Sequence, residues 1–382
     1  MMGLSRRTFA ALALSALLAA CQVVPKPGPT PPPKPQPTAP VDTLPTDTGR
    51  HRIALLVPLS GENGAAGRAI ANATTMALLD TNAQNLRITT YDTAPGAGVA
   101  ASRALAEGNK LILGPLLREE VTAVLAQARP ADVPLITFSN DTSIAAPDVF
   151  VMGHVPEQSV FRTVAWAAGK GSRRYAALVP EGDYGRRTTD ALSQAVGASG
   201  GQLIAIERYA RGNTSIVSAA QRLKAKGGYD TVLVSDGARL SAMAAGALKS
   251  AGSALPAIIG TELWSGEASI GTTPALRGAW FSSVSDGRYQ QFVKSYQARF
   301  GEQPYRIATL GYDSVLLTLR VAREWQPGRK FPVGKMLSAE GFLGLDGPFR
   351  FRANGVGERA MEVRQVGNGT VTVVDAAPTR FN

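Results

Sequence analysis

The chain has 382 residues, which is long enough for two lobes of ordinary size beside any segment that does not fold. Its formal net charge is +11, but no dense run of lysine and arginine is interleaved with aromatic residues, so nucleic acid is a poor candidate partner. Because the whole chain contains one cysteine, an intramolecular disulfide is excluded and stability must come from core burial.

The first 20 residues have the pattern of a signal peptide. Arginines at positions 6 and 7 precede an apolar stretch at 9–18, and two alanines follow it. The stretch is shorter than the about 20 apolar residues that a membrane span requires, so we expect export rather than insertion. The segment SRRTF (5–9) resembles a twin-arginine signal, and the general secretion route stays equally open.

Cys21 stands directly after this segment, in LAAC (18–21). These four residues resemble the lipobox of bacterial lipoproteins, which implies that Cys21 becomes an acylated N-terminus. Several acyl chains would hold the protein on a membrane, because each buried CH₂ contributes ~0.8 kcal/mol. Gln22 follows instead of an aspartate. By resemblance to the usual sorting rule this implies the periplasmic face of the outer membrane, with the inner membrane as the alternative.

Residues 21–49 are expected to form a linker between the lipid and the folded part. The segment 22–49 contains ten prolines, almost no large apolar residues, and two lysines balanced by two aspartates. Such a segment cannot bury a core, and its proline density favours an extended polyproline II conformation. We therefore expect residues 50–382 to form the folded domain.

This domain alternates short apolar runs with segments of helical period, which is typical of βαβ units. The first series has expected strands at 53–57, 86–91, 111–113 and 135–138 and expected helices at 66–80, 99–107 and 119–127. The second has expected strands at 175–179, 203–207, 231–234 and 257–259 and expected helices at 184–196, 216–224 and 239–249. The predicted fold class is α/β, with two doubly wound parallel-sheet lobes whose ligands would lie beyond the carboxyl ends of the strands.

A third region follows these two series. It has expected helices at about 287–300 and 307–325 and expected strands at 342–351, 361–366 and 370–374. A tail that returns to both series predicts crossovers that act as a hinge. We expect lobe 1 at about 50–155 and 283–358, and lobe 2 at about 156–282 and 359–382.

The chain resembles the type I periplasmic-binding fold of the leucine-binding class in the order and spacing of six segments. They are IALLVPLSG (53–61), LGPL (113–116), PLIT (134–137), DYG (183–185), GYD (311–313) and GLDGPFRF (344–351). Within that class it is most similar to the penicillin-binding protein activators, the LpoA-like lipoproteins. The resemblance implies a peptidoglycan synthase as partner. Activators of the fuller kind carry a helical-repeat domain where this chain has only the linker.

The resemblance also implies where an interlobe cleft would hold a ligand. Leucine-class receptors bind a carboxylate through hydroxyls and backbone N–H groups beyond the third and fourth strands. Here the loop 114–118 lacks the expected serines, while Ser139 and Asp141 follow the fourth strand and Asp141 would repel a carboxylate. Glu262 occupies a plausible ammonium-binding position. The family pattern is therefore only partly kept.

Further candidates for the cleft have simpler interpretations. Ser60 and Gly61 begin a glycine-rich turn that could bind an anion at a helix N-terminus or serve only as a tight turn. Asp183 is most simply a helix N-cap. Tyr184 and Trp264 could offer ring faces to a ligand, although packing in the seam between the lobes is the preferred interpretation.

No pattern for catalysis, a metal or a cofactor is found. The two histidines, His51 and His154, have no zinc-binding spacing, and no serine sits in a Gly-x-Ser-x-Gly elbow. The turn at 60–67 lacks the Gly-Lys-Ser/Thr ending of a nucleotide phosphate loop. We therefore expect a protein that is not an enzyme.

Two functions follow from the sequence. The first is an outer-membrane lipoprotein that activates a peptidoglycan synthase, a bifunctional penicillin-binding protein. The alternative is a lipoprotein that binds amino acids or small amides for an ABC importer, which Glu262 and the hinged fold favour. The cleft of either protein could hold a small molecule.

Overall fold

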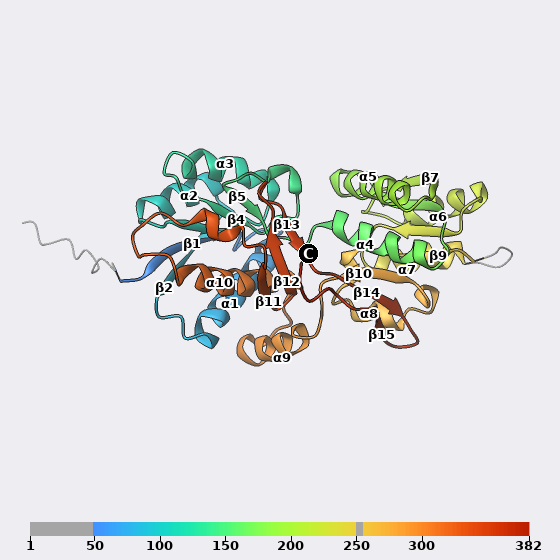
Figure 1. Ribbon diagram of the computed structural model, residues 1–382. Coiled ribbons are helices and arrows are strands. Elements are labelled where there is room, and N and C mark those ends of the chain that lie inside the picture. Colours follow the sequence, from blue (N-terminus) through green and yellow to red (C-terminus); the bar gives the residue numbers. More distant parts are fainter. Residues whose placement is uncertain (1–48, 250–254, 382) are drawn as a thin grey trace, which may run out of the picture. The chain divides into compact units, whose positions relative to one another are not determined.

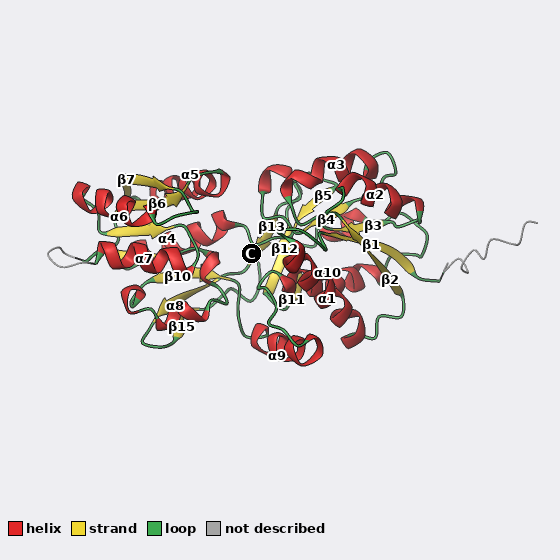
Figure 2. Cartoon of the chain, turned by 180° about the vertical axis from the view of Figure 1, so that it is seen from behind, coloured by secondary structure: helices red, strands yellow, loops and turns green. Residues whose placement is uncertain are grey.

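The computed structural model describes residues 49–249 and 255–381 (Figure 1). The expected signal peptide, Cys21 and nearly all of the linker lie outside the described residues. Among residues 49–249 and 255–381, none of the helices combines the length and apolar character that a bilayer crossing demands. The fold is α/β, as the sequence predicts, and two mostly parallel sheets each carry helices on both faces (Figure 2).

The sheet of lobe 1 consists of five parallel strands. Their order is β2 (Leu86–Asp92), β1 (His51–Val57), β3 (Leu111–Leu113), β4 (Leu135–Thr137) and β5 (Val149–Val151). Its two faces are covered by α1 (Gly64–Asp80) with α10 (Ala308–Ala322), and by α2 (Ala97–Ala106) with α3 (Arg118–Ala128). On β1, Leu55 packs toward the first pair and Leu56 toward the second. Burial of both faces explains why this strand is a continuous apolar run.

The sheet of lobe 2 repeats the same strand order in its parallel part. The order is β7 (Gln202–Tyr209), β6 (Arg174–Pro180), β8 (Thr231–Val234), β9 (Ala257–Ile259) and β10 (Trp280–Ser283). Two antiparallel strands, β14 (Glu362–Val366) and β15 (Val371–Asp375), extend it beyond β10. Its helices are α4 (Pro156–Gly169), α5 (Asp183–Ala198), α6 (Ser215–Lys226), α7 (Ala238–Leu248) and the short α8 (Ala268–Thr272).

The chain passes between the two sheets three times. It crosses from β5 to α4, from β10 to α9 (Tyr289–Phe300), and finally into β14. The last crossing starts at a three-stranded antiparallel sheet of β11 (Phe342–Gly344), β12 (Gly347–Phe351) and β13 (Gly357–Arg359), whose phenylalanines join the core of lobe 1. We keep residues 50–155 with 283–358, and 156–282 with 359–382, as the proposed division into lobes.

In both lobes the helix that follows the first strand starts unusually close to the end of that strand. A Cβ on Gly67 would lie 1.8 Å from the carbonyl oxygen of Pro58, and a Cβ on Gly185 would lie 1.7 Å from that of Pro180. Only glycine fits at such a separation. These two glycines therefore fix the starts of α1 and α5 beside the carboxyl ends of β1 and β6, where the candidate site lies.

Candidate functional site

A cavity of about 630 Å³ lies where the carboxyl ends of strands from both lobes meet. Lobe 1 lines it with the loops after β3 and β4 and with the starts of α1 and α10. Lobe 2 lines it with the start of α5 and the loop after β9. Of the residues expected in the cleft, five line this cavity: Ser139, Asp141, Asp183, Tyr184 and Glu262. Their role toward a ligand stays a proposal.

Glu262 is a buried acid in the cavity wall, with 8% of its surface exposed. The Tyr184 hydroxyl donates to its Oε1 over 3.0 Å and also lies 2.9 Å from Oγ1 of Thr261. Its second oxygen, Oε2, has no hydrogen-bond partner among the described residues. Burial raises the pKa of Glu262 to about 7. The side chain could therefore accept a hydrogen bond from a cationic or amide group that enters the cavity.

The loop after β4 uses its polar atoms to hold its own shape. Oδ1 of Asp141 accepts from the backbone N–H of Ser143 over 2.8 Å, and the hydroxyl of Ser139 accepts from the backbone N–H of Asp141 over 3.2 Å. Nε of Arg118 lies 3.2 Å from Oδ2 of Asp141. Burial acts to raise the pKa of Asp141, but the bonds from Ser143 and the charges of Arg187 and Arg118 outweigh it and lower that pKa. The expected repulsion from Asp141 is thus largely compensated within the protein.

Arg118 was not expected as a site residue, although it lies in the loop that sequence analysis singled out. Its guanidinium pairs with Asp141 in lobe 1 and with Asp183 in lobe 2. The expectation that Asp183 caps a helix is wrong, because Gly182 is the N-cap of α5 and Asp183 is its first residue. The Asp183 carboxylate instead pairs with Arg118 and Arg186.

Arg187 was also missed by sequence analysis. Its Nε and Nη2 donate to the two carboxylate oxygens of Glu157 over 2.6 and 2.7 Å, and Nη2 also donates to the backbone oxygen of Asn140 over 2.7 Å. It thereby joins α4 and α5 of lobe 2 to the loop after β4. Its spacing of four residues from Asp183 puts both side chains on one face of α5, and this was the signal that could have found it.

A buried charge cluster forms part of the cavity wall near the crossovers. Asp346 is fully buried and accepts from Arg306 over 2.6 Å, while Nε2 of His154 lies 2.8 Å from its Oδ2. Burial alone would raise the pKa of Asp346, but Arg306 and His154 hold that pKa well below its usual range. Burial lowers the pKa of His154 despite the bond to Asp346. No short-range pattern links these three residues, which lie far apart in the sequence.

Three expected site residues lie outside the cavity. Ser60 and Gly61 are exposed in the turn between β1 and α1, where Gly61 has a φ of +70° and its carbonyl accepts from Gly64 over 3.1 Å. Asn63 and Ala66 line the cavity in their place. The turn interpretation is therefore the one that the geometry supports, and α1 starts at Gly64 rather than at the expected residue 66.

Trp264 belongs to the core of lobe 2 and reaches neither the cavity nor the seam. It is 1% exposed, and its Nε1 donates to the backbone oxygen of Asp236 over 2.9 Å and lies 3.0 Å from Oγ of Ser241. The helical turn at Glu262–Trp264 directs Glu262 into the cavity and Trp264 the opposite way. We therefore correct the sequence-based placement of Trp264. Among residues 49–249 and 255–381, no cluster of three potential metal ligands occurs.

Two curated relatives match part of the chain. An uncharacterized protein of Rickettsia prowazekii is 28% identical over 142 residues, which is 37% of this chain and 38% of that protein. The penicillin-binding protein activator LpoA of Photobacterium profundum is 28% identical over 149 residues, which is 37% of this chain and 24% of that protein. The chain thus spans well under half of either relative in these matches.

Structural similarity covers much more of the chain. A putative branched-chain amino acid ABC transporter protein of Rhodospirillum rubrum superposes with a TM-score of 0.75 at 20% identity, over 85% of this chain and all of that one. At this identity the likeness shows the fold. A family described as periplasmic binding protein matches residues 51–370, and this family together with the activator relative indicates a periplasmic location. The chain belongs to the periplasmic binding protein family and has its type I, leucine-binding-class fold.

Proposed function

We propose that this protein is a non-enzymatic lipoprotein that binds and activates a peptidoglycan synthase, a bifunctional penicillin-binding protein, from the periplasmic face of the outer membrane. The similarity to an LpoA activator supports the partner. The lipobox-like segment before Cys21 and the proline-rich linker support an anchored protein that acts at a distance from its membrane. In this function the two-lobed fold serves as a protein-binding scaffold.

The observation that carries the proposal is the pairing of charges inside the cleft. A receptor for free amino acids must compensate a buried carboxylate, because an unpaired charge away from water costs several kcal/mol. In this cavity Arg118 is paired with two aspartates, and Arg187 is paired with Glu157 and with a backbone oxygen. The loop after β3 contributes Leu116 and Leu117 where hydroxyls would be needed.

A second candidate function is the receptor of an ABC importer for amino acids or small amides. One observation favours it: Oε2 of Glu262 is buried in the cavity wall and has no partner among the described residues. An ammonium or amide N–H group could supply that hydrogen bond. The two functions differ in what they require of the cleft, so one set of measurements distinguishes them.

We expect the full-length lipidated protein, in detergent, to increase the rate of glycan polymerisation or cross-linking by a purified bifunctional synthase. A different lipid-anchored periplasmic binding protein serves as the matched control and should leave the rate unchanged. In parallel, we expect no rise in melting temperature with any common amino acid at millimolar concentration. A ligand at 100 times its dissociation constant would stabilise the fold by ~2.7 kcal/mol, which a melting curve detects.

Two outcomes would contradict the proposal. Equal synthase rates with and without the protein would remove the activator function. A clear rise in melting temperature with one amino acid, lost in Glu262→Ala, would favour the importer receptor instead.

A further inference from the structure

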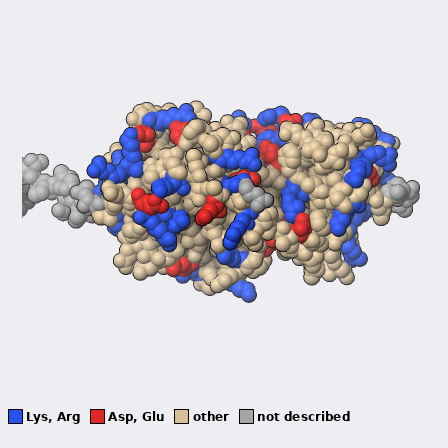
Figure 3. Space-filling view, viewed as in Figure 1, with Lys and Arg blue, Asp and Glu red and all other residues tan. Residues whose placement is uncertain are grey.

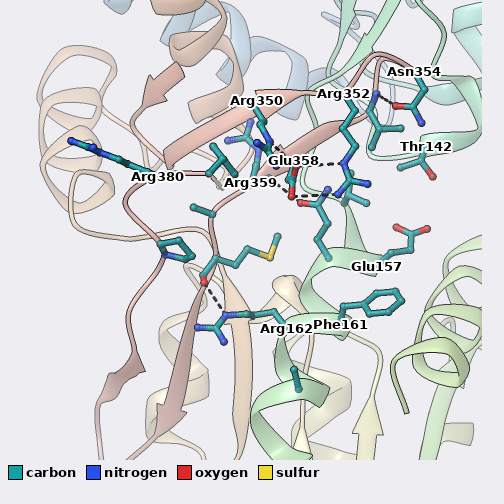
Figure 4. A pocket seen from close by; sticks show the side chains of 18 residues that line it. Thr142, Glu157, Phe161, Arg162, Arg350, Arg352, Asn354, Glu358, Arg359 and Arg380 are labelled. Atoms are coloured by element: carbon teal, nitrogen blue, oxygen red, sulfur yellow. Dashed lines mark hydrogen bonds and ion pairs between the residues drawn. The ribbon is translucent and has the colours of Figure 1, made fainter. Parts of the chain in front are cut away.

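A second cavity, of about 940 Å³, borders the cleft but shares no lining residue with it. Helix α4 forms one wall, and strands β12 and β13 with the segment between them form the other. Residues 378–381 close a third side. In Figure 4, Arg350, Arg352 and Glu358 lie on one side of the hollow, and Arg162 and Phe161 on the other. We call this second cavity the hinge groove.

The hinge groove is strongly basic. Its wall contains five arginines, Arg162, Arg350, Arg352, Arg359 and Arg380, and only two acidic residues, Glu157 and Glu358. Arg162 pairs with Asp375, and Arg359 lies 3.8 Å from Asp346, and neither acid lines the groove. The surplus of positive charge in this concave space is therefore carried by Arg350, Arg352 and Arg380 against Glu358. Figure 3 shows Lys and Arg side chains gathered around the place that Figure 1 marks C, on the same face. A concave basic surface attracts anionic groups and concentrates them.

The acidic residues of the groove are already engaged. Glu358 lies 2.9 Å from Nε of Arg350 and 3.3 Å from Nη2 of Arg352, so one carboxylate is shared between two guanidinium groups. Glu157 is taken by Arg187, which lies outside the groove. The Arg352 side chain remains 63% exposed. Its planar guanidinium can therefore bind a further carboxylate in the two-pronged geometry that arginine favours.

Apolar side chains stand among these charges. Phe161 on α4 is a large apolar residue that lines the groove, and 39% of its surface is exposed. The guanidinium of Arg350 lies 4.7 Å from the ring centre of Phe381, and Val155, Ala165 and Met361 also line the groove. A ligand that fits must therefore offer carboxylates and an apolar group together.

The groove also touches two of the three crossovers. Gln158 at the start of α4 donates to the backbone oxygen of Gly357 over 2.6 Å and accepts from the backbone N–H of Arg359 over 3.0 Å. Its amide thus occupies the open edge of β13 as a neighbouring strand would. A ligand seated here contacts both lobes at the point where the chain passes between them.

We propose that the hinge groove is a docking site for an acidic segment of a protein partner that also carries large apolar side chains. Charge complementarity and the exposed Phe161 favour a peptide over a flat bilayer surface, because the arginines and the apolar side chains line one concave space. The inference does not depend on the synthase as partner. It names the chemistry of the segment that binds and places the contact on the hinge rather than in the cleft.

The test uses the full-length protein and a fluorescent 12-residue peptide of alternating glutamate and leucine or phenylalanine. Fluorescence anisotropy should show saturable binding, and a peptide with glutamine in place of glutamate should not bind. The double variant Arg352→Glu with Arg380→Glu should weaken binding at least tenfold. The matched control reverses two exposed charges elsewhere, Arg103→Glu with Lys330→Glu, and should stay within twofold of the original protein. Phe161→Ala should weaken binding without any change in charge.

Several outcomes would overturn the proposal. If the peptide does not bind, the proposal is wrong. If both double variants lose peptide affinity equally, the attraction is only long-range and the groove is not the binding site. Binding of phosphatidylglycerol vesicles through Arg352 and Arg380, without peptide binding, would assign the groove to a membrane surface. Melting curves of every variant check the fold, and if the double variant does not fold, Arg380→Glu and Phe161→Ala decide the question separately.

Discussion

Glu262 is buried, and one of its carboxylate oxygens has no hydrogen-bond partner among the described residues. Its folded-state pKa of about 7 lies above the ordinary 4.5, with burial as the main cause. Between pH 4.5 and pH 7 this carboxyl group is therefore protonated in the folded state and ionised in the unfolded state. The stability that this proton contributes is fully present below pH 4.5 and is lost as pH rises through 7.

We accordingly predict that Glu262→Gln becomes stabilising relative to the original protein as pH rises from about 4.5 to above 7. A difference of about 2.5 pKa units corresponds to about 3 kcal/mol between the ends of this range. Urea unfolding at a series of pH values measures it. Glu267→Gln, in the same loop and exposed, is the matched control and should show little pH-dependent difference. Parallel curves for the two variants would refute the assignment.

For single residues, the sequence predicted cavity-lining positions that directly follow a strand. It did not predict the direction of side chains whose orientation depends on packing. Glu262 was found because it follows a strand in a position that the resemblance makes meaningful. Trp264, two residues later, was misplaced, because its direction depends on the core of lobe 2. Arg306 and His154 could not be linked, because Asp346 joins them only in the folded chain.

Among the elements, the start of α5 shows how closely a helix and a strand can approach. Gly185 leaves no room for a Cβ, whereas Gly197 near the end of the same helix has nothing within 4 Å of that position. We predict that Gly185→Ala destabilises the protein by about 1–3 kcal/mol or more, because a backbone oxygen must move. Gly197→Ala, the matched control, should be neutral or stabilise by up to about 1 kcal/mol. Urea unfolding compares them, and equal effects would show that the close approach is unimportant.

The elements that sequence analysis found share one property, a long or strongly apolar pattern. The central strands β1, β6 and β8 were recognised as apolar runs because both their faces are buried. β5 and β10, with three and four residues, were missed, although β3, β4 and β9 are equally short and were found, so length alone does not explain the difference. The expected strand at 342–351 is a hairpin, since Gly347 has a φ of +87° at the turn. Helix α4 was missed although it begins with a proline at a favourable position.

On the scale of the whole molecule, the proposed anchor and linker set where the folded domain acts. A polyproline II segment of 28 residues would reach up to ~85 Å at ~3.1 Å per residue. We predict that Cys21→Ala releases the protein from the membrane fraction, because several acyl chains supply the attachment. Gln22→Asp is the matched variant that keeps Cys21, and it should move the protein from outer-membrane to inner-membrane fractions. Continued membrane association of Cys21→Ala would refute the lipoprotein interpretation.

The three crossovers also govern the order in which this protein can fold during synthesis. Helix α1 of lobe 1 packs against α10, and β10 of lobe 2 pairs with β14, so each lobe needs residues made long after its first strand. About 230 residues separate the end of α1 from the start of α10, which takes on the order of 10 to 50 s at ribosomal rates. During that time the apolar face of α1 lacks its partner. Neither lobe can therefore complete its core before these late segments are available, whether the chain folds before or after export.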